Sequence, residues 1–254
     1  MEHIEQTQQP AAQTTSLMDR ITNVFASPSE LFDEVAVSKV KTSSWLVPMI
    51  LSILMGLFIV VALYFNDSLR SQIFDKQSEK MHELVEQGKM TQEQVDQYVD
   101  GMRNSGPVMF VAIGGGSAVI MTAIIFFAAT LIFWLVAKIG LKFSGPYTKM
   151  LEVFGLTSMI GFLGSVVAII FMYIFDSMTA TPSGAFFIYQ DFDVNNKLHL
   201  LLAQFNIFTI WQMGILGIGI SKISNKSLGA GLGVAYGLWI LWVLASVMFG
   251  LGMR

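Results

Sequence analysis

Five stretches of about 20 residues carry no Asp, Glu, Lys or Arg, and this pattern constrains the fold more than any other feature of the sequence. They are residues 45–65, 117–137, 154–175, 198–220 and 232–250. A helix of about 21 residues is about 31 Å long, which is enough to cross the hydrocarbon core of a bilayer. The sequence therefore predicts an all-α, polytopic membrane protein whose five transmembrane helices form a bundle.

The first stretch, Trp45 to Phe65, carries this signal most clearly. Thirteen of its 21 residues are Leu, Ile, Val or Phe, and together they favour insertion by roughly 4–8 kcal/mol. Trp45 and Tyr64 stand at its two ends, where aromatic side chains anchor a helix to the membrane interfaces. The second apolar run covers residues 108–139, too long for one span, and Gly114 to Gly116 predict a break that leaves 117–137 in the membrane.

The segments outside the apolar stretches divide into three parts. Residues 1–15 are polar and Gln-rich, which predicts a disordered tail. Residues 16–44 predict two short amphipathic cytoplasmic helices, the second starting at Pro28, which lie either on the membrane surface or against the bundle. Residues 66–107 follow the first span within the membrane domain 45–254. They predict a charged extramembrane helical hairpin that stands off the membrane. Gly88 should end its first helix, and Thr91 with Gln94 should cap its second.

Small residues at four-residue spacing predict close contacts between helices. Gly161 and Ser165 form such a pair in the third stretch, and Gly229, Gly233 and Gly237 form a stripe near the start of the fifth. Small residues let two helix backbones approach. We expect the stripe to contact another helix of this chain, namely the third or the fourth span, with a second copy as the alternative.

Polar amides are concentrated in the fourth stretch, at Gln204, Asn206 and Gln212. Two roles are open for them. They can hydrogen-bond neighbouring helices, which contributes about 1 kcal/mol per bond. Alternatively, they can line a path for a neutral or weakly polar solute, which would make the protein a channel or transporter.

The chain lacks the sequence patterns of the common enzymes and cofactor sites. It has no phosphate-binding loop, no nucleophile elbow and no His-Glu-x-x-His motif, so we expect no catalytic residues and no cofactor. Its three histidines are far apart in sequence and it has no cysteine, so no metal site is expected. The formal net charge of −3 gives no reason to expect a nucleic acid partner.

Three segments give the chain a resemblance to a known family. The lead-in RITNVFASPSELFDEV (Arg20 to Val35), the start of the first span at Trp45-Leu46-Val47-Pro48, and the pair of spans from Asn206 to Leu244 with its Ser-Lys turn together resemble the Yip family (Ypt-interacting-protein domain), most closely its bacterial branch. The resemblance implies a five-span helical protein with a cytosolic N-terminus. Eukaryotic members of that family act in vesicle transport and contact prenylated GTPases and each other.

The distribution of basic residues agrees with that orientation. We counted the Lys and Arg residues outside the long loop 66–107. If the N-terminus is cytoplasmic, eight of them face the cytoplasm and two face outside. We therefore expect a non-enzymatic protein of the bacterial inner membrane, with its C-terminus outside. Its expected role is to organise membrane proteins or lipids through helix packing, with lipids, other membrane proteins or further copies of itself as partners.

Overall fold

The computed structural model describes residues 15–103 and 106–249. Of the tail predicted for residues 1–15, only Thr15 lies within the described residues. The helices are α1 (Leu17–Ala26), α2 (Pro28–Val37), α3 (Ser43–Phe65), α4 (Asp67–Glu86), α5 (Gln92–Arg103), α6 (Pro107–Gly140), α7 (Tyr147–Phe175), the 3₁₀ helix η1 (Gly184–Ile188), α8 (Lys197–Gln204), α9 (Ile207–Ile223) and α10 (Leu228–Phe249).

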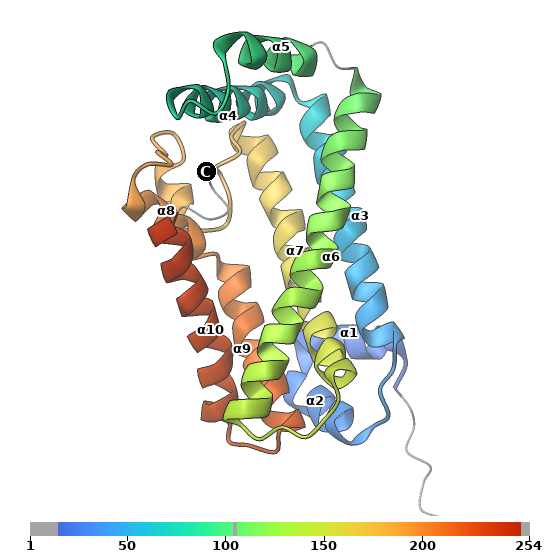
Figure 1. The fold of residues 1–254 in the computed structure, drawn as a ribbon. Coiled ribbons are helices and arrows are strands. Elements are labelled where there is room, and N and C mark those ends of the chain that lie inside the picture. Colours follow the sequence, from blue (N-terminus) through green and yellow to red (C-terminus); the bar gives the residue numbers. More distant parts are fainter. Residues whose placement is uncertain (1–14, 104–105, 250–254) are drawn as a thin grey trace, which may run out of the picture.

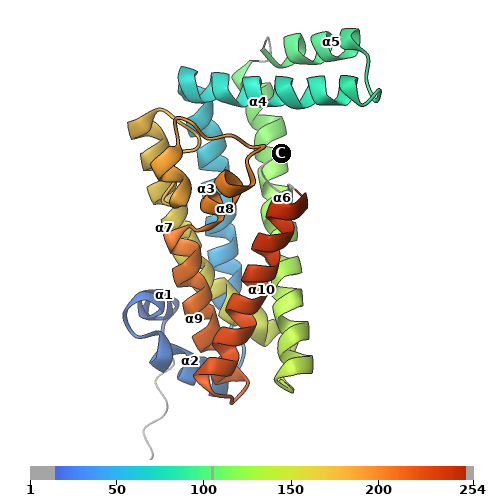
Figure 2. The ribbon, with the colours of Figure 1, turned by 90° about the vertical axis from the view of Figure 1, so that its left-hand side faces the viewer.

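The long helices form one bundle, seen in Figures 1 and 2. Within the described residues, four of them are long and apolar enough to cross a membrane: α3, α6, α7 and α10. Helix α3 packs against α6 and α7, and α9 packs against α7 and α10. Helix α7 therefore joins the two halves of the bundle, and it holds more buried residues than any other described helix.

The fourth predicted span, residues 198–220, is not one continuous helix. It divides into α8 and α9 at Phe205 and Asn206, and α9 has only 17 residues. A neighbouring loop supplies hydrogen bonds at the break: the amide of Gly184 donates to the Phe205 carbonyl over 3.2 Å, and the amide of Ile207 donates to the Pro182 carbonyl over 3.1 Å. The interruption thus leaves these backbone groups paired.

The second span, in contrast, lacks a break that was predicted. Gly114 to Gly116 do not break the helix, because α6 is continuous over 34 residues, a length of about 51 Å. The glycines instead allow α3 to approach: a Cβ atom placed on Gly115 would lie 2.9 Å from Leu57. In an apolar medium an unbroken helix keeps its backbone hydrogen bonds, and this outweighs the low helix propensity of glycine.

Helices α4 and α5 lie across one end of the bundle, and in Figure 2 they extend past its side. The side chain of Gln72 ties α4 down, donating to the Asp176 carbonyl (2.9 Å) and accepting from the Met178 amide (3.0 Å). The hairpin is therefore tied to the end of the bundle, and its position off the membrane stays a prediction. Its expected turn is confirmed: Gly88 has φ of 68°, and Thr91 and Gln94 cap α5 reciprocally.

The lead-in helices α1 and α2 lie at the other end of the bundle (Figure 1). They pack on protein, with Leu31, Phe32 and Val35 almost fully buried against α7 and α9. Of the two positions left open by the sequence, the structure adopts the one against the bundle. Ser27 makes no side-chain cap for α2, whereas Ser16 and Asp19 form a capping box that begins α1.

Candidate functional site

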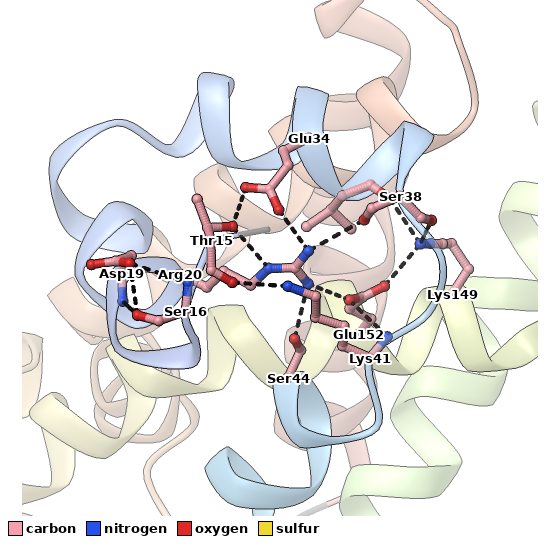
Figure 3. Close-up of polar contacts among 11 residues, drawn as sticks. Thr15, Ser16, Asp19, Arg20, Glu34, Ser38, Lys41, Ser44, Lys149 and Glu152 are labelled. Carbon is pink, nitrogen blue, oxygen red and sulfur yellow. Dashed lines mark hydrogen bonds and ion pairs between the residues drawn. The ribbon is translucent and has the colours of Figure 1, made fainter. Parts of the chain in front are cut away.

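The most polar buried place among the described residues surrounds Arg20 on α1, drawn in Figure 3. Its side chain has no solvent exposure. One terminal nitrogen, Nη1, donates to Glu152 Oε1 (2.6 Å) and to Ser44 Oγ (3.0 Å). The other, Nη2, donates to Glu34 Oε1 (2.7 Å). The guanidinium thus connects α1 with α2, α3 and α7.

Glu152 on α7 is the second centre of this cluster, and it is also fully buried. Its Oε1 accepts a further bond from the backbone amide of Lys41 (3.2 Å), and its Oε2 accepts from Lys149 Nζ (2.8 Å). Lys149 in turn donates to the carbonyls of Val35 (2.8 Å) and Ser38 (2.9 Å) at the end of α2. We call Arg20, Glu34, Lys149 and Glu152 the buried charge cluster; it contains two cations and two anions.

Glu34 forms the more exposed edge of the cluster. Burial alone would raise the pKa of its carboxyl group, but hydrogen bonds from Thr15 and Arg20 and the positive charges of Arg20 and Lys41 outweigh this effect. The pKa of Glu34 therefore lies below its ordinary value of 4.5. The carboxylate is ionised at neutral pH and attracts the Arg20 guanidinium.

Local sequence explains how the cluster is assembled. The capping box at Ser16 sets the start of α1, and helical spacing then places Arg20 on the same side as Val24, the other buried residue of that helix. Lys149 and Glu152 stand three residues apart in the first turns of α7, so they share one helix face. The cluster fixes the lead-in helices to the bundle, because separating them would leave charges buried and unpaired.

Sequence reasoning missed this cluster, although two signals were present. Arg20 stands three residues after Leu17 and four before Val24, so it shares the apolar face of an amphipathic helix, and a cation on such a face indicates a buried partner. Glu152 lies just outside the third predicted span, which begins at Phe154. The structure starts α7 at Tyr147 and so includes it.

Of the predicted packing residues, Gly161 lies at a close contact. A Cβ atom placed on Gly161 would lie 2.9 Å from Gln212 Oε1, so α7 and α9 come together here. Ser165 donates to the Gly161 carbonyl over 3.0 Å and therefore bonds within its own helix. The two residues thus have different roles: Gly161 provides space for Gln212, and the Ser165 hydroxyl is hydrogen-bonded within its own helix.

The predicted stripe on α10 does not make the expected contact within the described chain. A Cβ atom on Gly229, Gly233 or Gly237 would meet nothing within 4 Å there. The close approach of α10 to α9 occurs at Gly231, where a Cβ atom would lie 2.1 Å from the Gly217 carbonyl oxygen. Because two residues turn a helix by about 200°, Gly231 faces away from the stripe. Contact of the stripe with a second copy stays a prediction.

The three amides of the fourth stretch are not brought together. Gln204 ends α8, Asn206 caps α9 by accepting from the Phe208 amide (2.9 Å), and Gln212 lies against Gly161. The cap at Asn206 accounts for one of them as a local structural residue. Within the described residues, no group of three or more His, Cys, Asp or Glu side chains is arranged to hold a metal ion.

Comparison with known proteins places the chain in a family. Neither a search of curated proteins nor a search of solved structures gives a significant match. A family model described as the Yip1 domain matches residues 22–251, which include α2 to α10 and the second half of α1. The chain is therefore a member of the Yip1 domain family and an integral membrane protein of that type.

Proposed function

We propose that this protein is a non-enzymatic organiser of other membrane proteins, and that it presents to them the end of the bundle where α1 and α2 are docked. One observation carries the proposal: the buried charge cluster fixes both helices to α3 and α7. A surface held in one conformation loses little conformational entropy when a partner binds. It also carries exposed apolar side chains, among them Met18 (70% exposed) and Val37 (88% exposed).

The proposed topology has five crossings, with α8 and α9 together forming the divided fourth. The membrane in this proposal is the inner membrane of a bacterium. Helices α1 and α2 lie on its cytoplasmic side, and the α4–α5 hairpin lies outside. The basic residues support this orientation, because Lys138, Lys142, Lys149, Lys222 and Lys226 all belong to the helix ends or connections next to α1 and α2. Positively charged loops remain in the cytoplasm.

Reporter fusions test the topology separately from the role. Fusions after residue 90 and at the C-terminus should both report an extracytoplasmic position, and a fusion at the N-terminus a cytoplasmic one. A cytoplasmic signal at residue 90 would contradict the proposed orientation. It would leave the docking of α1 and α2 unaffected, since that rests on contacts within the chain.

Photocrosslinking in native membranes tests the organising role. A photoreactive residue at Val37 should crosslink to a discrete protein, and the crosslink should weaken when Arg20→Met releases the lead-in helices. Val108, 82% exposed near the opposite end, provides the matched control and should not give the same product. If the Val37 crosslink persists unchanged in the Arg20→Met variant, the docked surface is not what the partner recognises, and the proposal fails.

A further inference from the structure

Two adjoining cavities lie beneath α4, at the end of the bundle opposite the buried charge cluster. The larger, about 630 Å³, lies between α4 and the segment 179–203. The smaller, about 370 Å³, lies between α4, α5 and the helices α3 and α6. Gln77 on α4 lines both, so it stands at their common boundary. Volumes of this size are typical of small-molecule sites.

The two cavities differ in chemistry. Charged side chains of both signs line the larger one: Lys76, Lys80, Glu79 and Glu83 of α4, with Asp193 opposite. Apolar side chains dominate the smaller one, including Phe74, Phe110 and Met178. A single occupant that fills both must therefore carry a charged group joined to an apolar chain.

The smaller cavity also reaches the surface that surrounding lipid would cover. Ile113 forms part of its wall and is 62% exposed on α6, a helix long and apolar enough to cross a membrane. Val60 contributes from α3, a second such helix. An acyl chain can therefore enter this cavity from the hydrocarbon region without leaving an apolar environment.

We propose that these cavities bind one zwitterionic phospholipid of the ethanolamine type, with its headgroup in the larger cavity and an acyl chain in the smaller. The lysines match the phosphate, and the carboxylates match the primary ammonium, which donates three hydrogen bonds. The five charged side chains sum to −1, two cations against three anions, so they disfavour an anionic headgroup. A quaternary ammonium has no N–H to donate, so a choline headgroup binds less well.

Lys76 supports the position of the phosphate. Desolvation by nearby protein atoms lowers the pKa of its ammonium group, although the neighbouring Glu79 raises it. A partly desolvated ammonium is stabilised by a further anion in contact with it. A phosphate in the larger cavity would provide that anion.

Native mass spectrometry of the full chain in detergent, titrated with phospholipids of identical acyl chains, tests the proposal. We expect one phosphatidylethanolamine bound per chain, and phosphatidylcholine and phosphatidylglycerol bound about tenfold more weakly, since one hydrogen bond to a charged group is worth about that factor. Equal binding of all three lipids would overturn the headgroup assignment.

Two pairs of variants locate the site. Ile113→Trp fills the smaller cavity and should abolish the bound lipid, whereas Ile120→Trp, two turns further along α6 at 60% exposure, should retain it. Lys76→Gln should weaken binding about tenfold, whereas Lys89→Gln, in the exposed turn before α5, should not. Unchanged binding in Ile113→Trp would overturn the proposal.

A crosslinking experiment keeps the test independent of how the variants fold. A photoactivatable phosphatidylethanolamine, added to the unmodified protein in liposomes, should attach to residues 73–83 or 107–114. Attachment mainly to other faces of α6 or α10 would overturn the assignment. The lipid site requires only that the chain spans a membrane, so its failure and the failure of the organising role are separate results.

Discussion

Replacing Arg20 with methionine tests whether the buried charge cluster holds the lead-in helices in place. The change keeps an unbranched side chain of moderate length but removes the charge and all its donors. Two ion pairs disappear, to Glu34 and to Glu152, together with the bond to Ser44. Removing one partner of a buried pair costs about 3–5 kcal/mol. Glu152 keeps Lys149 and the Lys41 amide, so we expect the lower end, about 3 kcal/mol.

Amide hydrogen exchange measures this cost where it acts. A loss of about 3 kcal/mol raises the population of the undocked state by about two orders of magnitude. Exchange in residues 17–38 should accelerate by about that factor, while exchange in the middle of α7 changes little. Arg70→Met is the matched control, because Arg70 pairs with an 89% exposed Asp67 and should contribute under about 1 kcal/mol.

A double variant separates charge imbalance from general damage. Glu152→Gln added to Arg20→Met removes one anion as well as one cation, so the cluster again contains equal numbers of each. Neighbouring residues of one network couple by about 0.5–3 kcal/mol. The double variant should therefore be destabilised by less than the sum of the two single variants. If Arg20→Met exchanges like Arg70→Met, or if the two changes simply add, the proposed role of the cluster is wrong.

Three further predictions follow from other parts of the structure. Gly231→Ala should lower thermal stability in detergent by roughly 1–3 kcal/mol, because its Cβ would meet a backbone oxygen, whereas Gly233→Ala should not lower it. The folded pKa of Glu34 lies below its ordinary value of 4.5, so its contribution to stability is complete above about pH 4.5 and is lost as the pH falls through the lower, folded pKa. Hydrogen exchange of α1 should report this loss, and a Glu34→Gln variant should lack the change. Asn206→Ala should destabilise α9 by about 1 kcal/mol, measured by exchange at Phe208.

Features encoded by neighbouring residues could be predicted from the sequence. Pro28 marks the first turn of α2, Gly88 takes the positive φ that ends α4, and Thr91 and Gln94 start α5. The long apolar helices were also evident, because burial of about 20 uncharged residues in lipid depends on composition and length alone. The four helices long enough to cross a membrane fall where four of the five stretches were expected.

Features that depend on distant residues could not be predicted. The break before α9 is stabilised by Pro182 and Gly184, about 20 residues earlier, and no residue at Phe205 or Asn206 requires it alone. The face of α10 that contacts α9 could not be identified from the sequence, because an apolar helix has no polar face to orient it. Glycines occur on two sides of α10. Only the position of α9 determines that Gly231, and not the stripe, makes the contact.

The sequence separation within the buried charge cluster sets an order for biogenesis. Arg20 and Glu152 are 132 residues apart, so at a synthesis rate of about 5–20 residues per second Arg20 leaves the ribosome roughly 7–26 s before its partner. During that interval α1 and α2 lack their main docking site, and Arg20 remains hydrated. Correct seating of the lead-in helices therefore follows insertion of α7. A nascent chain in which α7 is inserted wrongly would expose those helices to proteolysis, which makes the N-terminal segment a natural reporter of whether the bundle has been assembled.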